Sequence, residues 1–280
     1  MINKVVSSAE EAVADIPDGA SIAVGGFGLV GIPARLIDAL RAQGAGDLTI
    51  ISNNLGTDGF GLVGIPARLI DALRARGVGD LTIISNNLGT DGFGLGLLLA
   101  DKRISRSIGS YLGTNKEYAR QYLEGELTVE FTPQGTLAER LRAGGAGIPA
   151  FYTKAGVGTP LATGEIPTRY NPDGTIAEYS QPKELREFGG EQYVMETALT
   201  PDFAFVHAHK ADRFGNLVFS KTAQNFNPDA AVAGNVTIVQ AEEVVDEIPA
   251  AEVNLPGIYV DRVVEVGPQE TGIEFRTVSE

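Results

Sequence analysis

The sequence predicts an α/β protein with a mainly parallel sheet flanked by helices. Apolar runs of strand length, such as 20–24 and 47–52, alternate with stretches that have helical spacing. Alternation of strands with helices of roughly ten residues is typical of βαβ units. Glycine, which makes up 35 of the 280 residues, lies mostly at the junctions. No change of composition marks a boundary, so we expect residues 1–280 to form a single domain.

The first helix and strand follow from local signals. Ser8-x-x-Glu11 resembles a capping box that opens a short helix ending near Ile16. The apolar run 20–24 is bounded by Gly19 and by a Gly-Gly pair, which predicts a buried strand.

The second helix is predicted between Pro33 and Gly44. Proline suits the first helical position, and glycine commonly ends a helix. The apolar stripe that this helix would bury consists of Leu36, Ile37 and Leu40. The run 47–52 (DLTIIS) is the next strand.

The rest of the chain continues the alternation, apart from one interruption. Four prolines between 154 and 190 break the pattern, which indicates a long loop or hairpin insertion there. Helices are predicted at 115–123 and 136–143, and strands at 104–111, 127–132, 148–152, 203–209, 217–220, 237–240 and 258–264.

An internal repeat stands out. Residues 27–59 and 60–92 are identical except that Gln43 becomes Arg76 and Ala45 becomes Val78. Two near-identical copies do not suit a solenoid, which needs three or more diverged repeats. We interpret them as a recent tandem duplication or an assembly accident. The second copy repeats the helix at 66–76 and the strand at 80–85, so it must add a strand to the sheet or pack outside it.

Composition excludes several classes of function. Lys and Arg total 22 and Asp and Glu total 36, which gives a net charge of −14. This charge disfavours binding to nucleic acid or to an anionic membrane surface. Cysteine is absent, so a disulfide framework and a thiolate nucleophile are excluded. The N-terminal residues lack the apolar core of a secretory signal, and we expect a cytoplasmic protein.

A glycine motif follows the first predicted strand. Gly26-x-Gly28-x-x-Gly31 has the form of a dinucleotide-binding fingerprint. The acidic residue expected at the end of the next strand is missing, because Ser52, Asn53 and Asn54 stand there. The loop could be a plain tight turn, or a cradle of backbone amides for an oxyanion or a thioester.

Neutral amide side chains follow three of the strands. The pairs Asn53-Asn54 and Asn86-Asn87, and Gln134 in the stretch 132–136, lie where ligands bind in open α/β sheets. A carboxamide can donate to a carbonyl or carboxylate without carrying charge. Each position also suits an ordinary turn or helix cap.

Two histidines, His207 and His209, are spaced to share one face of a strand. No third ligand stands near them in the sequence, so we expect packed or hydrogen-bonded histidines and no metal site.

Longer motifs then identify a family resemblance. Residues 18–33 (DGASIAVGGFGLVGIP) resemble the signature of family I CoA-transferases, and four further motifs follow in the family's order. These are 47–54 (DLTIISNN), 131–140 (FTPQGTLAER), 143–151 (AGGAGIPAF) and 210–216 (KADRFGN). The likeness runs to about 266 and is greatest to the α subunits of the 3-oxoacid, succinyl-CoA:acetoacetate type.

The resemblance implies a ping-pong transfer of CoA between succinyl-CoA and a 3-oxoacid. A glutamate forms an acyl anhydride and then a CoA thioester, and in this family it belongs to the β subunit. We find no matching Ser-Glu-Asn/x-Gly stretch here, so the chain is expected to act with a β partner, in an α2β2 assembly. It needs no permanently bound cofactor, since the CoA thioester is a substrate.

The site residues that the resemblance implies come from three places. The loop Gly25, Gly26, Phe27 and Gly28 would contact substrate, and Gln134 would contact the oxyanion. An asparagine pair would assist, either Asn86 and Asn87 or the duplicate Asn53 and Asn54.

The repeat is the main departure from the family, whose members carry this block once. The alternatives that remain open are the α subunit of a 3-oxoadipate or acetate CoA-transferase and an inactive duplicated relative. An NAD-dependent oxidoreductase fits less well because its ribose-binding acid is missing.

Overall fold

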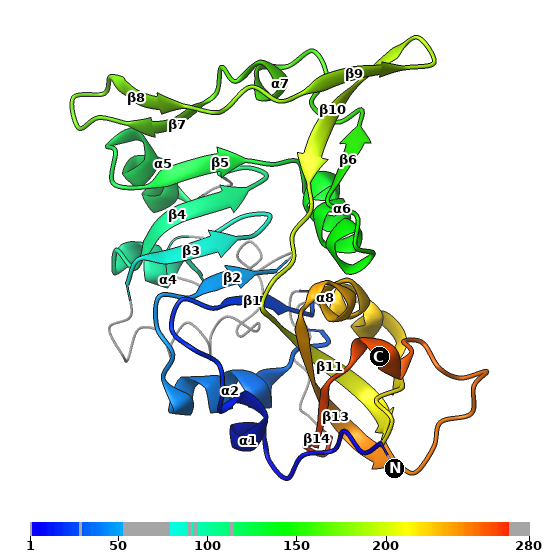
Figure 1. Ribbon diagram of the computed structural model, residues 1–280. Helices are drawn as coiled ribbons and strands as arrows, with labels where there is room; N and C mark the ends of the chain where they lie inside the picture. Colours follow the sequence, from blue (N-terminus) through cyan, green and yellow to red (C-terminus); the bar gives the residue numbers. More distant parts are fainter. Residues whose placement is uncertain are drawn as a thin grey trace, which may run out of the picture.

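The computed structural model describes residues 2–27, 30–52, 79–88, 91, 95–112 and 115–268. Its centre is a nine-stranded sheet in which eight strands lie in the order β14-β13-β11-β1-β2-β3-β4-β5, while β12 pairs with β11 (Figure 1). Every pairing along this path is parallel, and only β12 is antiparallel. The predicted α/β fold with a mainly parallel sheet is therefore confirmed.

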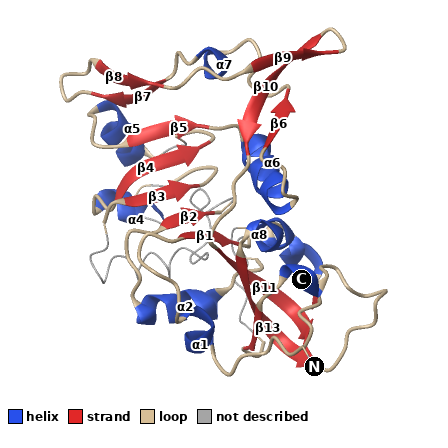
Figure 2. Ribbon diagram, viewed as in Figure 1, coloured by secondary structure: helices blue, strands red, loops and turns tan. Residues whose placement is uncertain are grey.

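Most strands of this sheet are short, and β11 and β13 are the longest, with ten residues each. The strands are β1 (Ser21–Val24), β2 (Thr49–Ile51), β3 (Leu81–Ile84), β4 (Ile104–Gly109), β5 (Thr128–Phe131), β11 (Phe203–Asp212), β12 (Leu217–Val218), β13 (Val236–Val245) and β14 (Arg262–Glu265). Helices lie on both sides of the sheet (Figure 2). They are α1 (Ala9–Val13), α2 (Ala34–Gln43), α4 (Leu95–Ala100), α5 (Lys116–Leu123), α6 (Gln134–Gly145), α7 (Pro160–Thr163) and α8 (Asn227–Ala233), with 3₁₀ turns at Lys221–Gln224 and Gly257–Tyr259.

Local signals place the first two helices. The Ser8 hydroxyl accepts a hydrogen bond from the Glu11 amide at 3.2 Å, which is one half of the predicted capping box. The other half is displaced by one residue, because the Glu11 carboxylate accepts from the Ser7 amide at 2.9 Å and not from that of Ser8. Gly44 ends α2 with a φ of 101°, a conformation that costs glycine little. Pro33 is the N-cap of α2 and not its first helical residue, a shift of one position from the prediction.

The repeat adds a strand to the sheet. β2 from the first copy and β3 from the second are parallel neighbours, and equivalent residues face each other: Thr49 with Thr82 and Ile51 with Ile84. The predicted strand therefore forms twice, side by side. The helix predicted at 66–76 lies outside the described residues.

The core has a distinct part on each face of the sheet. On one face, Ile50 and Ile83 pack with residues of α1, α2, α4 and α5. On the other face, Ile51, Ile84 and Ile108 pack against Leu137 and Leu141 of α6 and against α8. Successive residues of one strand therefore pack on opposite faces of the sheet, because side chains alternate along a strand.

The segment from 148 to 197 leaves the main sheet. The strand predicted at 148–152 forms as β6 (Ala150–Thr153), but it pairs with β10 (Glu191–Thr197) in a small sheet of order β6-β10-β9. The interruption at 154–190 contains α7, the hairpin of β7 (Pro167–Tyr170) and β8 (Ile176–Tyr179), and β9 (Leu185–Phe188). Figure 1 shows β7 and β8 running past the β5 edge of the sheet.

Other boundaries differ from the prediction in small ways. The strand expected at 258–264 begins only at Arg262, because a 3₁₀ turn after Pro256 occupies its first residues. α6 begins two residues early, at Gln134. Among the described residues, none of the helices combines the length and apolar character that a bilayer crossing requires.

Candidate active site

The candidate site residues that the structure describes lie at the carboxyl ends of strands β1, β3 and β5. In a parallel sheet these ends meet at one edge, where ligands of open α/β proteins bind. Gly25 follows β1, Asn86 follows β3, and Gln134 follows β5. Gly28, Asn53 and Asn54 lie outside the described residues, so the first asparagine pair has no structural description.

The glycine loop is held tightly against α8. The Gly25 amide donates to the Phe205 carbonyl at 2.9 Å, which extends the pairing of β1 with β11. A Cβ atom at Gly25 would lie 2.1 Å from Oδ1 of Asn227, so no larger residue fits without a shift. Phe27 and Val30 exchange two backbone hydrogen bonds of 3.1 Å, and the Phe27 side chain is exposed. The loop therefore presents Phe27 to solvent from a fixed base.

Two buried amide side chains fix the ends of this loop. Asn227 donates to the carbonyl of Gly31 at 2.8 Å, and its Oδ1 accepts from the His207 amide at 2.9 Å. Pro33 offers no side-chain cap to α2, and Gln240 Oε1 supplies one by accepting from the Arg35 amide at 2.8 Å. Sequence reasoning missed both Asn227 and Gln240, because each acts on a loop about 200 positions away in the chain.

The second asparagine pair is engaged in the fold. The Asn86 backbone carbonyl accepts from the Ser110 amide at 2.9 Å, which ties the end of β3 to the end of β4. Asn87 is buried, with 8% of its surface exposed, whereas Asn86 is half-buried. The Asn86 side chain is therefore the more accessible donor of this pair.

Gln134 occupies the first turn of α6, where backbone N–H groups point toward the sheet edge. Its side chain is exposed. Because β2, β3 and β4 lie between β1 and β5, four strand spacings of about 4.8 Å separate the two strands that lead into the glycine loop and Gln134 by roughly 19 Å. The two predicted parts of the site share an edge without being neighbours.

Buried hydroxyls also line this edge. Oγ of Ser52 and of Ser110, and Oγ1 of Thr132 and of Thr136, have no hydrogen-bond partner within the described part of the chain. Unsatisfied buried polar groups are uncommon in folded proteins, and a cluster of them calls for an explanation. The sequence signal that could have found them is a serine or threonine at or just beyond the end of a predicted strand.

The two histidines form hydrogen bonds, as the sequence analysis expected. Nδ1 of His209 lies 2.7 Å from Oε2 of Glu242, and Nε2 of His207 lies 3.3 Å from Oε1 of the same residue. Burial lowers the pKa of His207 despite the opposing effect of Glu242, so its ring is neutral at pH 7. In the ranges that the structure covers, no group of three or more candidate ligands could hold a metal ion.

Comparison with known proteins decides the family. The family model described as coenzyme A transferase matches residues 6–59 and 55–266, two stretches that overlap inside the repeat. The chain belongs to the coenzyme A transferase family.

Curated relatives extend over nearly the whole chain. One is a subunit of the probable succinyl-CoA:3-ketoacid coenzyme A transferase of Mycobacterium tuberculosis, which is 51% identical over 279 residues, covering 99% of this chain and 99% of the relative. The corresponding chain of the Xanthomonas campestris enzyme is 55% identical over 265 residues, covering 94% and 88%. The human mitochondrial relative is 45% identical over 96% of this chain, which spans only 46% of that protein.

Solved structures support the same fold. An acyl-CoA transferase from Escherichia coli O157:H7 superposes with a TM-score of 0.63 at 24% identity, covering 96% of this chain and 48% of the other. Glutaconate coenzyme A-transferase from Acidaminococcus fermentans gives a TM-score of 0.59 at 20% identity, covering 94% and 76%. At these identities the likeness concerns the fold alone.

Proposed function

We propose that this chain is the α subunit of a 3-oxoacid CoA-transferase, which moves CoA from succinyl-CoA to a 3-oxoacid such as acetoacetate. The observation that carries the proposal is the identity of 51% over 99% of both chains with a relative named as one subunit of such an enzyme. The carboxyl-edge site supports it, because its donors are neutral amides and hydroxyls suited to a carboxylate, a thioester or an oxyanion.

The chemistry divides between two kinds of chain. A glutamate carboxylate of the β chain attacks the thioester carbonyl, and an anhydride forms as CoA thiolate leaves. The thiolate then attacks the glutamyl carbonyl and releases the first acid, which leaves a glutamyl thioester. The carboxylate of the second acid then attacks the glutamyl carbonyl, expels CoA thiolate and forms a new anhydride. The thiolate attacks the acyl carbonyl of this anhydride, which gives the product thioester and regenerates the glutamate carboxylate. Covalent catalysis of this kind replaces one difficult exchange with several activated steps.

The α chain supplies the donors that stabilise each oxyanion. Gln134, Asn86 and the amides of the Gly25-Gly26-Phe27 loop lie at the edge where the β chain would bring its glutamate. We further propose an α2β2 assembly in the cytoplasm with no permanently bound cofactor. The extra strand favours one alternative, an inactive duplicated relative, because it separates the loop from Gln134.

Co-expression with a β chain from the same type of enzyme tests the function. The purified complex should form acetoacetyl-CoA from succinyl-CoA and acetoacetate, and the isolated chain should not. Turnover by the isolated chain would contradict the division of labour. Absence of turnover in a stable complex would favour the inactive relative, and preference for 3-oxoadipate or acetate would reassign the acceptor.

Replacing Gln134 tests the role of the donors. In the complex, Gln134→Ala should lower kcat by about 10²–10³, the usual effect of removing one oxyanion donor, with a smaller change in KM. Gln192→Ala, in an exposed position on β10, is the matched control and should leave kcat unchanged. An unchanged kcat in Gln134→Ala would show that Gln134 does not stabilise the oxyanion and serves only in the first turn of α6.

A further inference from the structure

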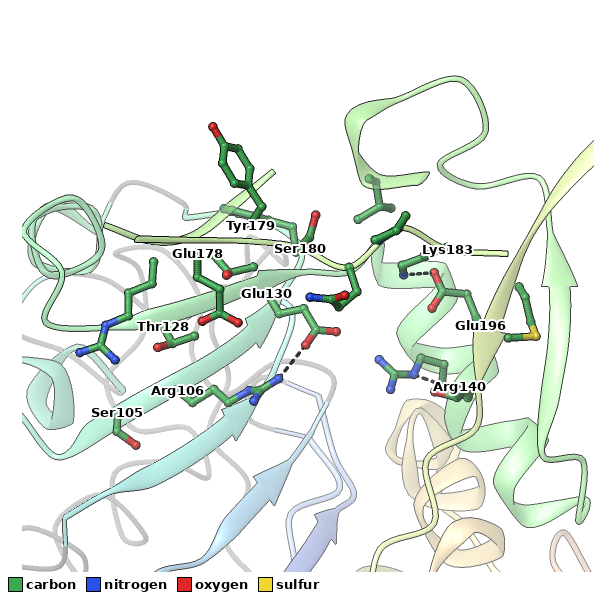
Figure 3. A pocket seen from close by; sticks show the side chains of 18 of the residues that line it. Ser105, Arg106, Thr128, Glu130, Arg140, Glu178, Tyr179, Ser180, Lys183 and Glu196 are labelled. Carbon is green, nitrogen blue, oxygen red and sulfur yellow. Dashed lines mark hydrogen bonds and ion pairs between the residues drawn. The ribbon is translucent and has the colours of Figure 1, made fainter. Parts of the chain in front are cut away.

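A cavity lies apart from the described residues of the candidate active site. It has a volume of about 790 Å³ and is enclosed by the outer part of β4 and β5, the α6 helix and the chain between β8 and β10. The volume is in the range of small-molecule sites. Figure 3 shows its lining, in which Arg106 and Glu130 stand on one side and Lys183 and Glu196 on the other. The described residues of the candidate active site do not line it.

Most of the charges inside this cavity are already paired. Arg106 Nη2 lies 2.9 Å from Oε2 of Glu130. Lys183 forms an ion pair with Glu196, whose side chain is 5% exposed. In these pairs the charges of four of the cavity's side chains compensate each other. The paired side chains therefore attract a charged ligand only weakly.

Two cations of the lining, Arg140 and the exposed Arg169, form no ion pair among the described residues, and Arg140 is the buried one. It is 9% exposed, and its Nε donates to the carbonyl of Thr197 at 2.8 Å. Among the described residues no carboxylate forms an ion pair with it, and its two terminal nitrogens have no hydrogen-bond acceptor there. Figure 3 shows its guanidinium between the two ion pairs. Because Arg140 lines the cavity and has no counterion among the described residues, an anion in the cavity could pair with its guanidinium.

The other side chains of the lining indicate which kind of anion would fit the cavity. A guanidinium fork matches carboxylate and phosphate groups alike. The exposed carboxylates Asp80, Glu178 and Glu184 at the rim repel a dianion more strongly than a monoanion. Apolar side chains complete the lining and suit a short hydrocarbon tail: Phe131, Leu161, Pro182 and Met195.

We propose that this cavity binds a short-chain aliphatic monocarboxylate, whose carboxylate pairs with the terminal nitrogens of Arg140 and whose tail contacts the apolar lining. The site is separate from the described residues of the candidate active site. Gln134 and Arg140 belong to the same helix, but six residues place them about 9 Å apart along its axis and about 120° apart around it. The proposal holds whether or not the chain transfers CoA.

Methionine NMR provides the direct test. The chain has two methionines, Met1 and Met195, and Met195 lines the cavity. With 13C-methyl-methionine in the full-length protein, butyrate at constant ionic strength should shift the Met195 signal saturably and leave the Met1 signal unchanged. Butyramide, which has the same shape without the charge, and inorganic phosphate should produce no saturable shift. Equal effects of butyrate and butyramide, or none from either, would overturn the proposal.

Variants on α6 identify the residue. Arg140→Lys keeps the charge but loses the fork, and it should weaken butyrate binding at least about tenfold. Arg140→Gln should abolish it. The matched control is Arg142→Gln, since Arg142 is exposed on the same helix and pairs with Glu139 at 2.6 Å. Its affinity should equal that of the unmodified protein.

Folding of the variants is checked by the other methyl signal and by circular dichroism. If Arg140→Lys and Arg140→Gln fold and bind butyrate as tightly as the unmodified protein, Arg140 is not the ligand-binding group. If both unfold, the comparison of butyrate with butyramide in the unmodified protein decides.

Discussion

The strands β2 and β3 have the same sequence and different neighbours. Both belong to a DLTIIS segment, and in both the aspartate before the strand has a positive φ, 53° at Asp47 and 61° at Asp80. Ile50 and Ile83 are buried on one face of the sheet. The strand β2, however, lies between β1 and β3, whereas β3 lies between β2 and β4.

At their carboxyl ends, too, the two strands bond in the same way to different neighbours. The Ser52 amide donates to the Ile84 carbonyl at 2.9 Å, and the Ser85 amide donates to the Ile108 carbonyl at 2.9 Å. The six residues therefore determine the strand and its buried side chains, while the neighbouring strand is chosen by the rest of the chain. One consequence is that the second copy adds one complete strand to the sheet. The added strand makes the carboxyl edge of the sheet wider by one strand spacing.

Removing one copy should have the largest effect. Deletion of 60–92 should bring the glycine loop and Gln134 closer by one strand spacing, about 4.8 Å. A misplacement of about 1 Å can cost roughly 10² in rate, so the complex with the β chain should gain at least about 10² in kcat. We also expect a higher Tm. A full-length chain that melts as high and turns over as fast would show that the extra strand is harmless.

Truncating the central isoleucine of each copy tests whether both strands belong to the core. Ile50 is 1% exposed and Ile83 is 0% exposed. Each change to alanine should lower the free energy of unfolding by about 2–5 kcal/mol in a urea titration. A silent Ile50→Ala beside a damaging Ile83→Ala would mean that the first copy's strand packs outside the sheet. The exposed Ile2 offers a control, because Ile2→Ala should have little effect.

The difference between the copies at position 43 should have the smallest effect. Gln43 donates to the Ile16 carbonyl at 2.7 Å and accepts from the Ala45 amide at 2.8 Å. Gln43→Arg, which gives the first copy the residue of the second, should lower the free energy of unfolding by about 1 kcal/mol. An unchanged stability would show that these two bonds contribute nothing net. Arg76→Gln is the reciprocal substitution in the second copy.

The sequence predicts most of the main sheet because its signals are local. The run 20–24, the stretch 47–52 and Gly44 each specify an element through apolar period or backbone freedom, and the structure has all three. The order of five longer motifs indicates the family, and the comparison with the family model confirms it.

Features that depend on distant contacts could not be predicted in this way. The strand at 150–153 has the composition of a main-sheet strand, yet its partner is β10, some 40 residues later. Asn227 and Gln240 contact the glycine loop and the start of α2 from about 200 positions away in the chain. Arg140 is distinctive because it is buried and no carboxylate pairs with it among the described residues. Such properties belong to the packing and not to any short stretch of sequence.

Cross-linking tests the central claim that the two copies form neighbouring strands in register. The chain has no cysteine, so introduced pairs report without background. Thr49 faces Thr82 in adjacent strands, and Thr82 faces Arg106 in the next. With Thr49→Cys and Thr82→Cys, mild oxidation should form a disulfide, since neighbouring strands bring Cα atoms within the range of about 4.4–6.8 Å that the bond requires.

The double variant with Thr49→Cys and Arg106→Cys is the negative control, in which no disulfide should form. Two strand spacings separate these positions by about 10 Å, which is too far for a disulfide. The account predicts a bond between positions 49 and 82 and none between 49 and 106 in the full-length chain. A bond between 49 and 106, with none between 49 and 82, would show that the second copy's strand is excluded from the sheet and would contradict the account.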